Sequence, residues 1–160
     1  MWDVQSAREH GDVLFDNLVE TWERLGRQDM SPLAFAFMSH EENGDECVVL
    51  PQVSVLPKEH IPTVLRLFAA EFDARFVALA ACATILEGLP PEEVEAWYAS
   101  GKRLAEHPKA QDCLILTIDG AGLSVCMRAW WDGERLCREV MDNHGAVGPM
   151  TNLSGRLGEN

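Results

Sequence analysis

Three of the five cysteines lie near an arginine in the last third of the chain, where they could form a reactive thiol centre. A strand register worked out from the turns places Arg128 between Cys113 and Cys137, with Cys126 one diagonal away. A guanidinium beside a thiol favours the thiolate, which is the nucleophilic form of cysteine. The same positive charge opposes a metal ion, and no histidine shares that face to act as a base. The pattern therefore favours ordinary buried cysteines.

A fourth cysteine, Cys47, could pair with His40 as a thiol nucleophile and its base. Asn43 and Gly44 predict a two-residue hairpin turn, and that turn places His40 opposite Cys47. An imidazole within hydrogen-bond reach of a thiol can remove its proton, as in cysteine hydrolases. This register depends on one turn, and a slip of one residue separates the pair. A solvated hairpin tip is the favoured interpretation, so the sequence gives no strong catalytic candidate.

The same hairpin tip gathers four carboxylates that could bind a divalent cation: Glu41, Glu42, Asp45 and Glu46. Opposed like charges destabilise a hairpin, so a bound cation would relieve a real repulsion. The segment lacks the alternating Asp and Asn ligands and the distal Glu of an EF-hand loop. Charged residues also commonly keep sheet edges from pairing with other chains. We therefore favour a polar turn without metal, and we expect no cofactor.

Trp130, Arg128, Arg135 and Ile115 form the candidate binding surface that the sequence supports best. The register puts all four on one face of the sheet, with Arg135 opposite Trp130. An arginine beside an indole makes a cation–π contact, and Trp and Arg are enriched at the centres of protein interfaces. The face is too mixed for a dry core and too apolar for open solvent. Coverage by a helix of the same chain is an equally good interpretation.

A three-stranded antiparallel meander is expected to position these side chains. The strand-like runs are residues 113–118, 123–131 and 134–140. They are separated by Asp-Gly turn signals, which are strong indicators of hairpins. Counting back from both turns puts Leu116, Val125 and Leu136 on the core face, and Arg128 and Trp130 on the reverse face. The two hairpins select the same core face independently, which supports the assignment.

Earlier segments predict helices and further strands. Apolar spacing indicates helices at residues 5–27 and 58–72 and, after Pro90 and Pro91, a third helix, with hairpin strands at 33–38 and 47–55. Residues 75–87 fit either a helix or a buried central strand, and we favour the strand. This order predicts an α+β fold with an antiparallel sheet of about five to six strands. We expect the helices mainly on one face, and the meander at the C-terminal end.

The length of 160 residues suits a single α+β domain, which we assign to residues 1–140. Residues 141–160 are rich in glycine, show no periodicity and are expected to form a flexible tail. The start of the chain lacks a signal peptide, and no apolar stretch is long enough to span a bilayer. Five cysteines without a CxxC motif indicate reduced thiols. We therefore expect a soluble, cytoplasmic protein.

Charge narrows the choice of partner. The chain carries 26 acidic and 13 basic side chains, a formal net charge of −13. Such a surface repels phosphate backbones and anionic membranes, so direct nucleic-acid or membrane binding is not expected. The partner is expected to be a protein, either a basic one or a second copy of the chain. The sequence favours a non-enzymatic interaction module of inhibitor, immunity or adaptor type; the alternative is a small enzyme or ligand- or metal-binding protein that uses the Cys and His pair or the thiols.

Overall fold

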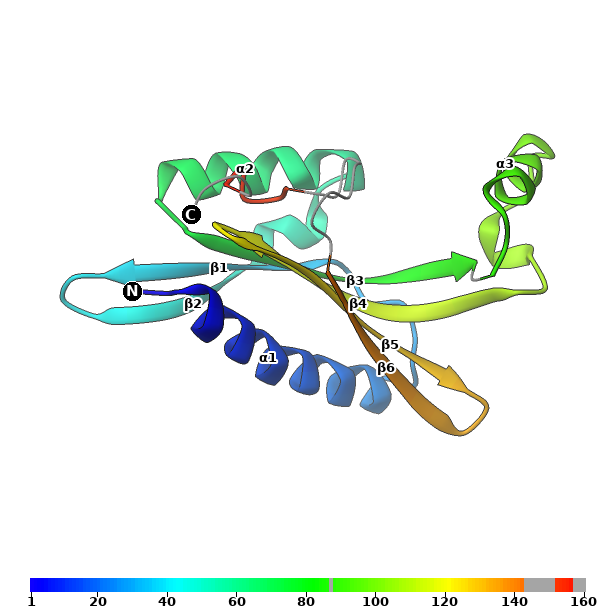
Figure 1. Cartoon of the computed structure of the whole chain (residues 1–160), viewed down its shortest axis with the longest axis horizontal. Helices are drawn as coiled ribbons and strands as arrows, with labels where there is room; N and C mark the ends of the chain where they lie inside the picture. The colour runs from blue at the N-terminus through cyan, green and yellow to red at the C-terminus, as the bar shows by residue number, and fades with distance from the viewer. Residues whose placement is uncertain (87, 143–151, 157–160) are drawn as a thin grey trace.

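A computed structural model describes residues 1–86, 88–142 and 152–156 of the chain. Within them, three α-helices and a six-stranded antiparallel sheet of order β2-β1-β3-β4-β5-β6 are formed (Figure 1). The elements are α1 (Val4–Arg24), β1 (Leu33–His40), β2 (Gly44–Leu50), α2 (Ile61–Glu71), β3 (Phe76–Leu86), α3 (Pro91–Ala99), β4 (Ala110–Gly120), β5 (Leu123–Asp132) and β6 (Arg135–Asp142). Short 3-10 turns are η1 (Pro51–Val55), η2 (Lys58–His60) and η3 (Leu104–Glu106). The α+β class, the strand at 76–86 and the C-terminal meander β4-β5-β6 are confirmed.

The two long helices cover opposite faces of the sheet, so the expectation that helices gather mainly on one face is wrong. Figure 1 shows α1 beneath the sheet and α2 above it. Along β1, Phe35 and Phe37 join the cluster packed on α1, whereas Ala34 and Ala36 join the cluster packed on α2. A central strand that is apolar on both sides needs a cover on each side. The continuous apolar runs of β1 and β3 therefore require two layers of helix.

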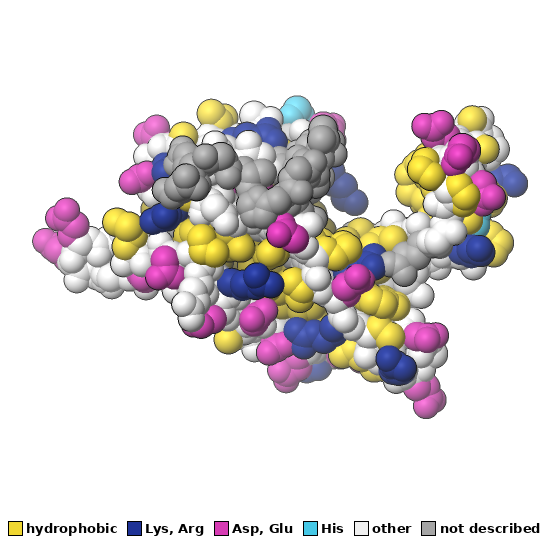
Figure 2. Space-filling view, in the orientation of Figure 1, with side chains coloured by type: hydrophobic (Ala, Val, Ile, Leu, Met, Phe, Trp, Pro, Cys, Tyr) yellow, Lys and Arg dark blue, Asp and Glu magenta, His cyan; other side chains and the backbone are white. Residues whose placement is uncertain are grey.

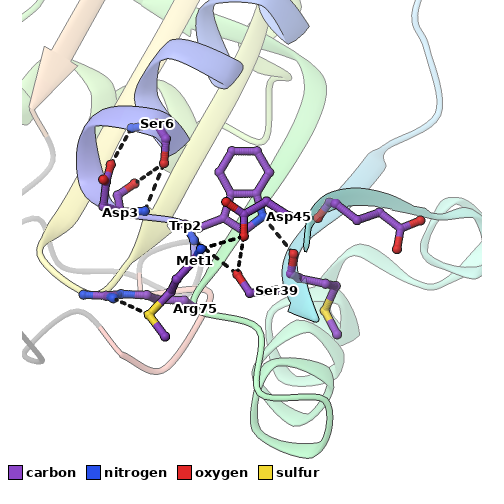
Figure 3. Close-up of polar contacts among 9 residues, drawn as sticks. Met1, Trp2, Asp3, Ser6, Ser39, Asp45 and Arg75 are labelled. Carbon is purple, nitrogen blue, oxygen red and sulfur yellow. Dashed lines mark hydrogen bonds and ion pairs between the residues drawn. The ribbon is translucent and has the colours of Figure 1, made fainter. Parts of the chain in front are cut away.

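Helix α1 begins at Val4, one residue before its predicted start, and ends at Arg24, three residues before its predicted end. Its N-cap is Asp3, whose carboxylate accepts a hydrogen bond from the Ser6 backbone N–H at 2.7 Å, and Ser6 Oγ accepts one from the Asp3 N–H at 3.0 Å (Figure 3). Gly11 lets the helix approach the sheet closely, because a Cβ there would lie 2.1 Å from Cδ1 of Ile118. The side chains that α1 buries are Ala7, Phe15, Leu18, Val19 and Trp22.

The sidedness of the meander is confirmed, but in both hairpins the partner opposite each residue is shifted by two positions from the prediction. Leu123 lies opposite Gly120, and Arg135 lies opposite Asp132. The turn between β4 and β5 is formed by Ala121 and Gly122, and that between β5 and β6 by Gly133 and Glu134. Gly122 and Gly133 take the left-handed φ values of +73° and +64° that such turns need. A shift of two residues leaves every side chain on its predicted face. The set Leu116, Val125 and Leu136 accordingly packs against α1.

The described part of the C-terminal segment packs against the body of the protein. Leu153 is fully buried, and its backbone N–H and that of Ser154 donate to the carboxylate of Asp119 at 2.8 and 2.9 Å. Arg66 Nε donates to the Asn152 carbonyl at 3.0 Å. Asp119, the aspartate of the first Asp-Gly turn signal, is fully buried near the end of β4 and holds this segment. The rest of the predicted tail lies outside the described residues, apart from the end of β6.

Candidate functional site

Strands β3 and β4 extend beyond α2, and α3 connects them at their far end (Figure 1). Figure 1 shows α3 at the far end of β3 and β4, on the side that carries α2. We call the part of this side that α2 leaves uncovered the distal face. Figure 2 shows the surface hollowed between the α2 region and α3. By strand register, the distal face is formed by Ala81, Ala83, Ile85, Cys113, Ile115, Arg128, Trp130 and Cys137.

An apolar groove lies at the α2 end of the distal face. Its volume is about 350 Å³, and its lining includes Pro32, Ile61, Leu79, Ala81 and Ala83. Lys58, on η2, also borders the groove. The two alanines create the space, since each extends only one carbon above the strand. In the sequence the alanine-rich run 78–83 indicates a buried strand and gives no sign of an accessible hollow.

The predicted binding residues share the distal face, but their neighbours differ from the prediction. Arg128 lies opposite Ile115 and Glu139, and its guanidinium pairs with the Glu139 carboxylate. The same guanidinium is 5.0 Å from the ring centroid of Trp130, so the cation–π contact is made by Arg128. Arg135 does not lie opposite Trp130, because the register shift brings Cys137 there. Arg128 is only 9% exposed, so its charge is hardly accessible to a partner, and its role on this face is to contact the Trp130 ring.

The cysteines of the distal face do not form the predicted centre around Arg128. Trp130, not Arg128, lies between Cys113 and Cys137 in the strand register. Burial raises the pKa of the Cys126 thiol, and this effect outweighs the Arg128 charge, which lowers it. A protonated, buried thiol is a poor nucleophile. The arrangement therefore fits structural cysteines better than reactive ones.

The predicted pairing of Cys47 with His40 is wrong. His40 lies opposite Gly44 and Cys47 lies opposite Phe37, on the other face of the sheet. The loop is formed by residues 41–43, because Gly44 takes a left-handed φ of +74° as the first residue of β2. Burial also raises the pKa of the Cys47 thiol to about 11. The imidazole of His40 instead lies 3.3 Å from the Glu46 carboxylate.

The acidic hairpin tip is partly neutralised by contacts with the start of the chain. The α-ammonium of Met1 lies 3.1 Å from Asp45, and Ser39 Oγ donates to the same carboxylate at 2.8 Å (Figure 3). The hydrogen bond from this ammonium, and then that from Ser39, lowers the pKa of Asp45. Trp2 holds the start of the chain against β1, because its indole N–H donates to the Met38 carbonyl at 2.9 Å. In residues 1–86, 88–142 and 152–156, no cluster of three or more His, Cys, Asp or Glu side chains is suited to a metal ion.

A second contact between tryptophan and arginine lies on the opposite side of the sheet. The Arg27 guanidinium is 3.7 Å from the ring centroid of Trp131, closer than Arg128 is to Trp130. The indole N–H of Trp131 donates to the Glu23 carboxylate. The sequence analysis missed this contact, although strand alternation puts Trp131 on the face that packs against α1. It joins the end of α1 to β5 and is a structural contact.

Helix α3 is largely exposed, with Val94 and Trp97 half-buried. None of its nine residues is buried, and Tyr98 is 55% exposed. Its contacts are local: the Trp97 indole N–H donates to the Arg103 carbonyl at 2.8 Å, and the Trp97 and His107 rings are 4.5 Å apart. Isolated helices shorter than about 12 residues are marginally stable in water. We call α3 and η3, residues 91–106, the α3 arm.

Comparison of the chain with models of protein families, with curated proteins and with solved structures gives no match. Among the described residues, no helix is both long and apolar enough to cross a lipid bilayer. The distal face and the α3 arm are therefore the features on which a functional proposal rests.

Proposed function

We propose that this protein is a non-enzymatic interaction module that binds another polypeptide chain across the distal face and the α3 arm. The observation that carries the proposal is the exposure of α3, which buries none of its residues. Most helical stability in proteins comes from packing an apolar stripe against another element. A short helix held away from the body gains this packing when a partner covers it.

The distal face has the composition of an interface. It combines an apolar groove of about 350 Å³ with a half-buried tryptophan, Trp130, that is supported by Arg128. Tryptophan fixed by a neighbouring arginine is a frequent anchor in protein interfaces. The groove is lined by residues of η2, the start of α2 and β3, and Figure 2 shows the hollow that separates the α2 region from α3. A bound chain could therefore contact both the groove and the α3 arm at once.

Charge favours a protein partner over nucleic acid or a membrane. The net charge is −13, and the exposed residues of α3 include Glu92, Glu93 and Glu95. These carboxylates repel phosphate groups and attract Lys and Arg side chains. Inhibitor, immunity and adaptor roles fit such a surface, and the five free thiols suit a cytoplasmic location. The alternative of a thiol enzyme has less support, because burial raises the pKa of Cys47 and Cys126.

A photocrosslinking experiment tests the proposal. Benzoylphenylalanine is placed at Tyr98 on α3 or, as a control, at Phe72; both side chains are aromatic and 55% exposed. We expect crosslinks to another polypeptide, whether foreign or a second copy, from position 98 in the producing cells and few from position 72. Equal crosslinking from both positions, or none from position 98, would refute the proposal.

Affinity of the purified complex then locates the contact. Ala83 lies on the distal face, and the next residue, Thr84, points to the opposite side of the sheet. We expect Ala83→Lys to weaken binding of the crosslinked partner at least about tenfold and Thr84→Lys to leave it within about twofold. For a basic foreign partner, the association rate should also fall steeply with added salt. Identical affinities of the two variants would place the contact elsewhere.

A further inference from the structure

The α3 arm presents an apolar stripe that is only partly covered, since Val94 and Trp97 are half-buried and Tyr98 is exposed. Val94, Trp97 and Tyr98 are spaced at i, i+3 and i+4 and therefore lie on one side of the helix. Trp97 is held in place by the ring of His107 and by Lys102, whose ammonium lies 4.8 Å from its ring centroid. Tyr98 projects beyond these contacts and remains 55% exposed. The arm thus offers an exposed aromatic side chain, and tyrosine, with only two side-chain torsions, loses little conformational entropy on binding.

The apolar groove of the same chain could accommodate such an aromatic side chain. The groove is lined mainly by apolar atoms, with the small side chains of Ala81 and Ala83 at its floor. A volume of about 350 Å³ can hold an aromatic side chain together with a neighbouring aliphatic one. None of residues 91–106 lines this groove, and Figure 1 shows α3 apart from α2, so the arm does not fill the groove in its own chain.

Charged side chains border both the arm and the groove. On the arm, Glu93 and Glu95 flank the apolar stripe, and Glu92 lies on the opposite side of the helix. Lys58 and Glu59 both border the groove, and Arg135 is exposed at the end of the distal face. Carboxylates placed near these cations would pair with them at short range. The overall repulsion between two copies of charge −13 is screened beyond about 8 Å at physiological salt. Short-range complementarity can therefore outweigh it.

We propose that two copies of this chain form a reciprocal dimer in which the α3 arm of each copy lies in the apolar groove of the other. The inference rests on the proposed function, because it names the occupant of that surface. A two-fold axis makes the exchange self-complementary, so one interface covers both arms and both grooves and leaves no open end for further growth. A foreign segment would cover the groove of one copy and leave its arm only partly packed.

Sedimentation equilibrium of the full chain between 2 and about 200 µM tests the dimer. We expect the wild type to dimerise, and we expect both Tyr98→Lys on the arm and Ala83→Lys in the groove to raise the dissociation constant at least about tenfold. Thr84→Lys is the matched control and should leave it unchanged. Circular dichroism and thermal unfolding confirm that each variant remains folded, which is expected because Tyr98 is exposed and Ala83 is half-buried.

A crosslink between isotopically distinct copies identifies the contact. Unlabelled chain with benzoylphenylalanine at position 98 is mixed with ¹⁵N-labelled wild type and irradiated. We expect mixed-isotope crosslinks that join position 98 to residues 79–85 or to 113–115 of the labelled copy.

A chain that stays monomeric at the highest concentration, or a dimer that neither lysine variant weakens, would overturn the inference. If that monomer still crosslinks a foreign chain from position 98, and Ala83→Lys prevents it, the proposed function stands without the dimer. If position 98 captures no polypeptide at all, both fail.

Discussion

Replacing Asp119 with alanine should release the segment 152–156 and lower the free energy of unfolding by about 3 kcal/mol. The Asp119 carboxylate is fully buried and accepts two backbone N–H groups, those of Leu153 and Ser154. A hydrogen bond to a charged group contributes about 1.5–3 kcal/mol, so leaving both donors buried without an acceptor would cost about 3–6 kcal/mol.

Release of the segment is the less costly response. Once detached, both N–H groups bind water, and the main loss is the burial of Leu153, about 1.5–3 kcal/mol. The hydrogen bond from Arg66 to the Asn152 carbonyl adds about 1 kcal/mol. These two losses together give about 3 kcal/mol. They also predict a local change, in which the alanine variant loses the packing of 152–156 and retains the sheet.

Urea unfolding, followed by tryptophan fluorescence, measures the loss in stability, and hydrogen exchange of a peptide covering 152–156 measures the release. Asp112→Ala is the matched control: Asp112 lies on the same strand but is exposed, and Thr84 donates to it at 3.1 Å. It should cost about 0.5 kcal/mol or less, and it should leave exchange at 152–156 unchanged. If Asp119→Ala behaves like this control in both measurements, the carboxylate does not hold the segment.

Three further outcomes are expected. Gly11→Ala should destabilise the protein by about 1 kcal/mol in chemical unfolding, although alanine has the better helix propensity, because the new Cβ would meet Ile118 Cδ1. This loss of stability should be smaller in an Ile118→Val background. An equal loss in both backgrounds would exclude the clash. Iodoacetamide should label native Cys47 at pH 7 about 100-fold more slowly than an unperturbed thiol, and faster as the pH rises toward its pKa of about 11, whereas fast labelling at pH 7 would contradict a buried, protonated thiol. Millimolar calcium or magnesium should leave the Tm unchanged because the start of the chain and His40 already contact the acidic hairpin tip, and a rise in Tm would revive the metal hypothesis.

The first hairpin shows why a single turn is weak evidence for a site. Asn43 and Gly44 suggested a two-residue turn, but the loop is formed by residues 41–43. A shift of three in pairing moves Cys47 and His40 to opposite faces, since side chains alternate with a period of two. In the meander both hairpins shift by two, which preserves the faces but changes the neighbours of Arg128 and Trp130. Candidate sites that depend on a shared face therefore survive, and those that depend on a pair of neighbours do not.

Other features depend on contacts between segments that are distant in the sequence. Asp119 and Leu153 are separated by 34 positions, and no local pattern around either one indicates their hydrogen bond. The groove arises where Pro32, Ile61 and Ala83 meet, three residues from separate segments. The exposure of α3 likewise follows from the length of β3 and β4, which carry it beyond α2 (Figure 1).

By itself, the sequence determined the α+β class, the strand at 76–86, the meander and the separation of Trp130 from the α1-facing core, because alternation and turn residues act over a few positions. Only the tertiary structure decided that α1 and α2 cover opposite faces, that Arg128 pairs with Glu139, and that an apolar groove forms beside α2 while α3 buries none of its residues. The physical reason is that these features depend on which distant surfaces fill the space beside each other, and packing of that kind is a property of the whole chain.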